Sequence, residues 1–196
     1  MILPIVAYGT PVLKKKAVDV AQDDPQLKQL IADMWETMYA ASGVGLAAPQ
    51  IGKSLRLFVV DASPFAEDED LSEEEQKELA GFKKVFLNPV IEKEEGDSWS
   101  FTEGCLSIPD LREDVSRPEQ LTIRYMDENF VSHTETYSGL PARVIQHEYD
   151  HIEGILFTDK LSPLKKRLIK GKLTNIAKGK VQPDYKMYFP MASKKR

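Results

Sequence analysis

The sequence has a single cysteine, Cys105, so no disulfide bond can form within the chain. This is typical of a reducing compartment and leaves the thiol available as a metal ligand or a nucleophile. No apolar run approaches the roughly 20 residues that a membrane-spanning helix needs. The apolar N-terminus has no basic segment before it and is followed by three lysines instead of a cleavage signal. We therefore expect a cytoplasmic protein with no membrane role.

The sequence also lacks the GxGxxG spacing of dinucleotide-binding proteins and the GxxxxGK spacing of phosphate-binding loops. No nucleotide cofactor is therefore expected. Internal repeats and interdomain linkers are missing as well, and 42% hydrophobic and 29% charged residues are the balance of a globular protein. A chain of 196 residues suits one domain with its own core, so we predict a single domain over residues 1–196.

Two segments carry charged residues of almost one sign. Residues 160–196 hold twelve basic residues and only one acid, although the chain as a whole has a formal net charge of −5. Such a segment could attract a polyanion such as RNA, or its lysines could be the solvated face of a helix. Residues 64–81 are the acidic counterpart, with eight acids and one lysine between Glu67 and Glu78. We predict that they form a mobile surface insertion between strands.

The hydrophobic pattern predicts both helices and strands. Apolar residues recur at helical spacing in three segments, over residues 24–43, 140–152 and 163–177. Short β-rich runs cover residues 55–60 and begin again at residue 85, where Asn88 and Pro89 interrupt the run. Two alternating segments within residues 121–137 flank a polar turn and predict a hairpin. This order predicts an α+β fold with antiparallel sheets packed around the second helix.

The second predicted helix carries His147-Glu148-Tyr149-Asp150-His151, which is the HExxH pattern. Residues four apart lie on one helical face, so both imidazoles can reach one cation. Glu148, one position further round, can exchange a proton with a water activated there. A purely structural metal is less favoured, because structural sites are usually closed by four ligands without a neighbouring Glu. The pattern predicts a hydrolytic metal site.

A catalytic metal needs a third protein ligand, and the chain offers no suitably spaced histidine after His151. The candidates are Cys105 and His133. We favour Cys105, because a thiolate is a strong ligand for zinc or ferrous iron and Gly104 allows close approach of the main chain. The competing interpretation is an inert buried cysteine. His133 falls in the alternating register of the predicted hairpin and is expected to be a surface or half-buried residue.

Small residues follow the first predicted helix in the segment GVGLAAPQ, which ends at Gln50. The amide of Gln50 could donate a hydrogen bond to a developing oxyanion. The segments GVGLAAPQ, EGCLS and QHEYDH, in that order, closely resemble the three motifs of the peptide deformylase family. The likeness extends from residues 9–11 to residues 161–163, which is most of the chain.

The resemblance implies a small α+β enzyme that removes the formyl group from the N-terminal formylmethionine of new bacterial proteins and releases formate. It also implies the metal ligands, which are Cys105, His147 and His151. Ferrous iron is the usual metal of the family, and zinc, nickel or cobalt can replace it.

The resemblance further assigns catalytic roles. Glu148 corresponds to the catalytic acid and base, and the Gln50 side chain and the Leu106 main-chain N–H correspond to the oxyanion donors. Gly45 matches a glycine whose carbonyl contacts the formyl-bearing amide, and Arg112 matches a basic residue near the mouth of the site.

An apolar pocket is expected to hold the methionine side chain, and we predict that Val44, Phe101 and Leu140 line it. Some relatives dock near the ribosomal exit through a basic C-terminal helix, and residues 160–196 are compatible with that use. Two other functions remain open from the sequence. One is a zinc endopeptidase of the HExxH class, and the other is a non-catalytic ribosome- or RNA-binding module with a structural metal.

Overall fold

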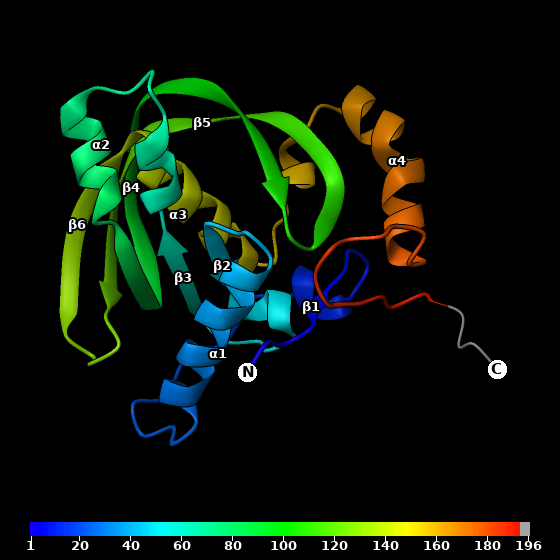
Figure 1. Ribbon diagram of the computed structural model, residues 1–196, viewed down its shortest axis with the longest axis horizontal. Coiled ribbons are helices and arrows are strands. Elements are labelled where there is room, and N and C mark those ends of the chain that lie inside the picture. Colours follow the sequence, from blue (N-terminus) through cyan, green and yellow to red (C-terminus); the bar gives the residue numbers. More distant parts are fainter. Residues whose placement is uncertain (193–196) are drawn as a thin grey trace.

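Five antiparallel strands form the main sheet, in the order β2-β3-β4-β5-β6 (Figure 1). The strands, in that order, are Gly45–Ala47, Leu57–Asp61, Lys83–Cys105, Ile108–Met126 and Ser132–Ser138. A second sheet pairs two short strands in parallel, β1 (Ile5–Val6) and β7 (Met187–Tyr188). The computed structural model describes residues 1–192, and the predicted α+β class is confirmed.

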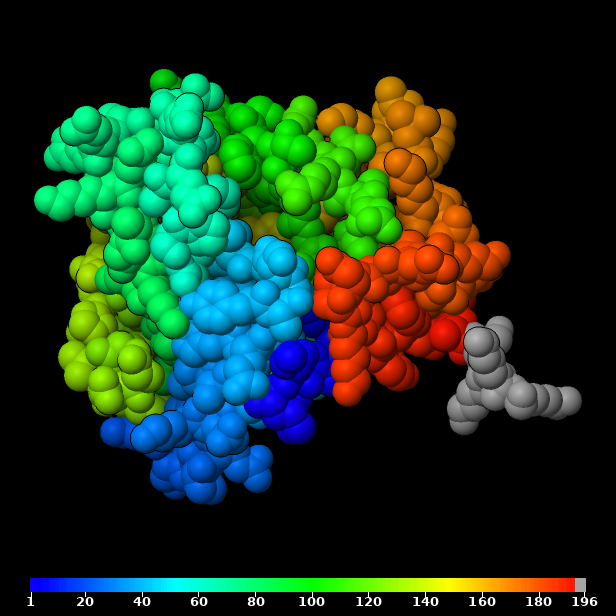
Figure 2. Space-filling model, in the orientation of Figure 1, coloured from blue at the N-terminus to red at the C-terminus, as the bar shows by residue number. Residues whose placement is uncertain are grey.

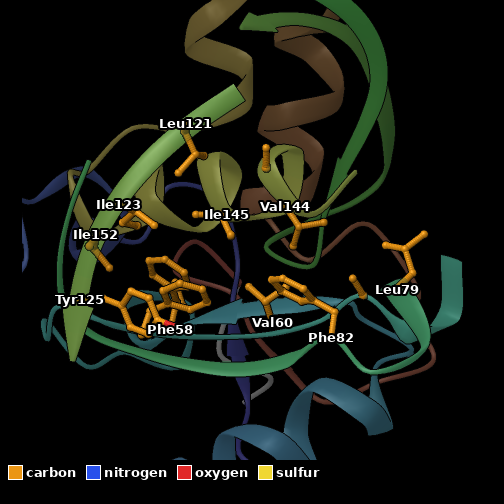
Figure 3. Packing of buried hydrophobic residues seen from close by; sticks show 14 of the residues in the cluster. Phe58, Val60, Leu79, Phe82, Leu121, Ile123, Tyr125, Val144, Ile145 and Ile152 are labelled. Atoms are coloured by element: carbon orange, nitrogen blue, oxygen red, sulfur yellow. The ribbon is translucent and has the colours of Figure 1, made fainter. Parts of the chain in front are cut away.

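Helix α3 (Gly139–Ile152) packs on the main sheet and carries the HExxH segment, as predicted. Its apolar side chains face one way because they recur at helical spacing. Ile145 and Ile152 are fully buried and belong to one cluster with Phe58 and Tyr125 of the sheet (Figure 3). Burying one aliphatic side chain of this size contributes roughly 2 kcal/mol. The metal-binding motif therefore lies on a helix that the core holds firmly.

Strand β3 is buried on both faces, because its alternate side chains enter different clusters. Phe58 and Val60 pack toward α3, whereas Leu57 and Val59 pack with helix α1 (Leu27–Ala40). A strand that is buried on both faces has a continuous run of apolar residues. The sequence therefore predicts β3 correctly.

The hairpin of β4 and β5 is longer than the sequence predicted. Its register pairs Trp99 with Arg117 and ends with Cys105 opposite Ile108. In Figure 1 the hairpin arches beyond the rest of the main sheet, and its tip returns near β1. This arch brings the cysteine at the end of β4 to the helix that carries the two histidines.

Two predicted boundaries were wrong. Helix α1 begins three residues after Asp24, because the Asp24 carboxylate accepts a hydrogen bond from the Gln26 N–H at 2.9 Å and forms a turn of its own. Asn88 and Pro89 do not interrupt β4, which continues through them with a register shift. The Asn88 amide instead exchanges two hydrogen bonds with the main chain of Val20, at 2.7 and 3.0 Å.

The acidic segment lies at the surface between β3 and β4, as predicted, but it contains helix α2 (Glu73–Ala80). A capping box begins the helix, because the Ser72 hydroxyl accepts from the Glu75 N–H and the Glu75 carboxylate accepts from the Ser72 N–H. Leu79 packs into the core cluster below α3. Local capping and one buried leucine thus order a segment whose composition alone indicates a loop.

Helix α4 (Pro163–Ala177) has the bounds that the sequence predicts. Its buried face consists of Ile169, Leu173, Ile176 and Ala177, and its basic residues lie mostly on the exposed side. Helices α2 and α4 lie at opposite ends of the longest axis in Figure 1, so the acidic and basic segments are far apart. Part of the predicted basic segment, residues 193–196, lies outside the described residues.

Four 3₁₀ helices complete the described elements: Pro11–Lys14, Ala48–Ile51, Ser63–Glu67 and Phe157–Lys160. After α4 the chain turns back across the molecule and reaches β7 beside the N-terminal strand. Within residues 1–192, no helix has the length and the hydropathy needed to cross a membrane.

Candidate metal centre

Three side chains from two elements meet at one point. Cys105 ends β4, and His147 and His151 lie one turn apart on α3. One donor atom from each lies within 4.8 Å of the other two, and the Cys105 Sγ is 3.3 Å from the His151 Nε2. One thiolate and two imidazoles suit ferrous iron or zinc. The donor set therefore fits a divalent transition metal with room for a further ligand.

A buried carboxylate holds the ring of His147. The His147 Nδ1 lies 2.9 Å from the Glu103 Oε2, which favours a proton on Nδ1 and leaves Nε2 as the ligand atom. Arg117 in turn donates two hydrogen bonds to Glu103, at 2.6 and 2.9 Å. Burial alone would raise the pKa of Glu103, but the hydrogen bonds from Arg117 and His147 outweigh it and hold this pKa well below its usual range. Glu103 is therefore an anion that orients the ligand.

Two further charged groups extend this network. Arg143 donates to the Glu103 carboxylate at 3.0 Å and to the carbonyl of Trp99 at 2.7 Å. Arg117 also donates to Asp150 at 2.7 Å. Each carboxylate in the network has a guanidinium partner, so the buried charges are compensated.

Glu148 is buried beside the ligands, and its Oε2 has no protein hydrogen-bond partner among the described residues. Burial raises the pKa of Glu148 to about 7. A buried carboxylate with a free oxygen is costly unless a further group occupies the space that it faces. The carboxylate is thus placed to exchange a proton near neutral pH.

Gly45 leaves the space that Glu148 occupies. A Cβ added at position 45 would lie 2.5 Å from the Glu148 Oε1 and 2.8 Å from its Cγ. Gly45 begins β2, whose pairing with β3 fixes its distance from α3. A glycine is therefore required here by close approach.

The amide of Gln50 is held in one orientation. Its Oε1 accepts a hydrogen bond from the Ala47 N–H at 2.8 Å, and its Nε2 lies 3.5 Å from the Cys105 Sγ. The side chain is 1% exposed, and Ala48–Ile51 form a short 3₁₀ helix that turns it inward. The Gln50 amide thus donates toward Cys105 and lines the cavity, with a second Nε2 hydrogen left for a further acceptor.

A cavity of about 900 Å³ opens onto these groups. The predicted residues that line it are Val44, Gly45, Gln50, Phe101, Cys105, Leu106, Arg112, His147 and Glu148. His151 lies behind them and is 1% exposed. His133 is remote, with its ring stacked on Tyr125 and its Nε2 2.9 Å from the Asp127 carboxylate.

Leu140, which the sequence predicts in the methionine pocket, lies apart from this cavity. The described cavity lining does not include Leu140, whose half-buried side chain packs against the core cluster of α3. Leu140 is two helical turns from His147, which is roughly 10 Å along the axis. Val144, one turn from His147, lines the cavity instead.

Sequence reasoning missed the supporting residues. Glu103 precedes Cys105 by two positions, so the same strand face was a usable signal. Arg143 precedes His147 by one helical turn, so its position on the same helix face was a second usable signal. No sequence signal pointed to Arg117, because its place beside Glu103 depends on the register of a long hairpin. Gln182 to Tyr185 also line the cavity, although they are distant in sequence from every motif.

The site therefore combines a HExxH helix, an upstream cysteine and an inward-facing amide around one cavity, which defines a metal-dependent hydrolase. The model of the polypeptide deformylase family matches residues 2–167, and the chain belongs to this family. The match ends before the C-terminal segment that lines the cavity.

Individual relatives agree with this assignment. The chain is 65% identical to a peptide deformylase of Christiangramia forsetii and 61% identical to one of Flavobacterium johnsoniae, and each alignment covers 100% of both chains. Among solved structures, it is similar to a peptide deformylase from Legionella pneumophila, with 39% identity and a TM-score of 0.74 over 89% of this chain and 95% of the other.

Proposed function

We propose that the chain is a metal-dependent hydrolase that removes the formyl group from the N-terminal formylmethionine of newly made proteins and releases formate. One observation carries the proposal: the Glu148 carboxylate is buried at the cavity that Cys105 and His147 also line, and one of its oxygens has no hydrogen-bond partner among residues 1–192. A structural metal site has no use for such a carboxylate.

Cys105, His147 and His151 are the proposed ligands of a ferrous ion, which zinc, nickel or cobalt can replace. When bound, such a metal polarises a carbonyl oxygen and generates a nucleophile from water at neutral pH. Glu103 fixes the tautomer of His147 for this task.

Glu148 is the proposed acid and base. The buried carboxylate, which has an unpartnered oxygen among the described residues, is proposed to accept a proton from the attacking water and to deliver it to the departing amine nitrogen. Gly45 leaves the space that this carboxylate occupies, and the Gly45 carbonyl is proposed to accept a hydrogen bond from the amide of the formylated residue.

Two donors are proposed to stabilise the oxyanion that develops on the formyl oxygen. The Gln50 Nε2 lies beside Cys105 in an orientation that the Ala47 N–H fixes. The second donor is the main-chain N–H of Leu106, the residue that directly follows Cys105 in the chain. Preorganised donors of this kind stabilise a transition state without reorganisation, and loss of one typically costs 10²–10³-fold in rate.

The methionine side chain is proposed to lie against the apolar part of the cavity. Val44, Phe101 and Val144 line that part, and Arg112 contributes charge at the mouth. An apolar surface suits a flexible thioether, which is bound largely by burial.

Formate release tests this function. The protein is reconstituted with ferrous iron without oxygen and assayed on formyl-Met-Ala-Ser and on an unblocked internal peptide. We expect formate from the first substrate only, with activity lost in Cys105→Ala and in Glu148→Ala, although Glu148→Ala still binds metal. Cleavage of the internal peptide would favour an endopeptidase, and metal binding without either activity would favour a binding module.

We further propose that the protein works in the bacterial cytoplasm, where its basic helix α4 docks on the ribosome. Lys166, Arg167 and Lys170 are exposed on α4, and Leu164 and Leu168 of the same helix are 64% and 71% exposed. Cations beside exposed leucines suit a surface that offers phosphates and apolar patches.

A further inference from the structure

The turn that follows Cys105 is short and carries the proposed oxyanion donor. Leu106 and Ser107 are its two residues, because Cys105 pairs with Ile108 across the hairpin. Two-residue hairpin turns that match the twist of their strands need a positive φ. The residues with positive φ in the described chain do not include Leu106 or Ser107. The turn is therefore not of the types that best match strand twist, and contacts from elsewhere can stabilise it.

Both turn carbonyls are held by distant parts of the chain. The Tyr185 hydroxyl donates a hydrogen bond to the Leu106 carbonyl at 2.8 Å. The Tyr8 N–H donates to the Ser107 carbonyl, also at 2.8 Å. Burial raises the pKa of Tyr185, so its hydroxyl keeps its proton at neutral pH. The N-terminal and C-terminal segments thus each fix one peptide group of the turn.

These two segments also hold each other. Strands β1 and β7 pair in parallel, with the Ile5 N–H donating to the Lys186 carbonyl at 2.9 Å and the Ala7 N–H donating to the Tyr188 carbonyl at 2.8 Å. Figure 2 shows the C-terminal segment (red) at the surface beside the N-terminal residues (dark blue). Tyr8 therefore lies just after β1 and Tyr185 just before β7, at opposite ends of the same two-stranded sheet.

The same segment closes one side of the cavity. Gln182, Pro183, Asp184 and Tyr185 are all lining residues, together with Cys105. Leu106 and Tyr185 pack against the same hydrophobic cluster. The segment thus contacts both the space where a substrate would lie and the turn that carries the donor.

We propose that Tyr185 is a positioning residue, which holds the Leu106–Ser107 turn so that the Leu106 N–H faces the formyl oxygen, and that residues 182–185 are a wall of the substrate cavity. This proposal rests on the proposed function. Hydrogen-bond donors act only within narrow limits of position, so a small shift of the turn reduces the rate without removing a catalytic group.

The test compares two substitutions that each remove one hydroxyl. Tyr185→Phe loses the hydrogen bond to Leu106, whereas Tyr188→Phe removes an exposed hydroxyl from the same segment. With formyl-Met-Ala-Ser and the iron-loaded enzyme, we expect Tyr185→Phe to lower kcat and kcat/KM together by roughly fivefold. KM is expected to stay near the wild-type value, and Tyr188→Phe is expected to behave as wild type.

Amide hydrogen exchange provides a second measurement that does not depend on catalysis. Exchange in a peptide covering residues 103–109 is expected to be faster in Tyr185→Phe than in wild type and unchanged in Tyr188→Phe. Unchanged exchange, unchanged kcat, or a rise in KM alone would overturn the positioning role. A wild-type enzyme that releases no formate would instead overturn the proposed function, and exchange would then still decide whether Tyr185 holds the turn.

Discussion

At the scale of single residues, the site depends on the absence of a side chain at Gly45 as well as on the side chains that are present. Gly45 contributes no side chain, and the Glu148 carboxylate fills the space that a Cβ would need. All the atoms that an added Cβ would contact most closely belong to the Glu148 side chain and none to the main chain, so this side chain can shift at a modest cost to the fold. The Glu148 side chain cannot make this shift and keep its carboxylate beside the metal ligands.

We therefore expect Gly45→Ala to leave the thermal unfolding temperature within a few degrees of wild type and to lower kcat/KM by about 100-fold or more. Formate release and circular dichroism measure the two quantities. Gly171→Ala is the matched control, because nothing lies within 4 Å of the added Cβ in α4. A Gly45→Ala enzyme with wild-type kcat/KM would show that the position of Glu148 is not critical.

Single residues also show how far the sequence alone leads to the site. Cys105 and the two histidines could be predicted, because short segments bring the right donor types to known spacings. Glu103 could have been found from its position two residues before Cys105. Arg117 could not, because its contact with Glu103 follows from the register of a hairpin that no local pattern encodes.

At the scale of elements, prediction succeeded where one face of an element is buried. The bounds of α3 and α4 follow from regular apolar spacing and from proline near the first turn. The lengths of β4 and β5, 23 and 19 residues, were missed. Between Glu92 and Ser100 the side chains of β4 are half-buried or exposed throughout, so hydrophobic alternation does not mark this part as a strand.

A polar cluster between the neighbouring strands β4, β5 and β6 makes their packing sensitive to acid. The Glu135 carboxylate accepts hydrogen bonds from Lys84 at 2.8 Å, from Tyr125 at 2.5 Å and from Tyr137. Burial raises the pKa of Glu135, but these hydrogen bonds outweigh it and lower the pKa to about 2. The folded protein thus binds this proton less readily than the unfolded chain does.

A lowered pKa in the folded state means that the stabilisation is present above the unfolded pKa near 4.5 and is lost as the pH falls toward 2. We expect the free energy of unfolding, measured with urea, to fall less between pH 5 and pH 3 in Glu135→Gln than in wild type. Glu119→Gln, which removes an exposed carboxylate from β5, is the control and is expected to keep the wild-type slope. Equal slopes in all three proteins would contradict the role of Glu135.

At the scale of the whole molecule, charge is separated along the longest axis. The acidic residues around α2 lie at one end and the basic helix α4 lies at the other (Figure 1). A charge distribution of this kind orients a protein as it approaches a polyanion, because one end is attracted and the other is repelled. The cavity is then presented in a defined direction relative to the docking surface.

We expect the double substitution Lys166→Glu and Lys170→Glu to weaken co-sedimentation with ribosomes at least about tenfold at 0.1 M salt. Turnover of a formylated tripeptide is expected to stay at the wild-type rate, because neither lysine lines the cavity. The same charge change at Lys28 and Lys53, two exposed residues outside α4, controls for net charge. Equal loss of binding in both double variants would show that α4 is not the docking surface.

The pairing of β1 with β7 joins residues from almost opposite ends of the described chain. Contacts of such long sequence separation form late, because the entropy of closing a large loop opposes them until the intervening structure exists. During synthesis β7 is also made after every other described element, so a nascent chain can complete its metal-binding helix before it has a finished cavity. A fragment that ends before Gln182 therefore keeps all three recognisable motifs but lacks four lining residues of the cavity and the strand that pairs with β1, so the three motifs alone do not make a complete cavity.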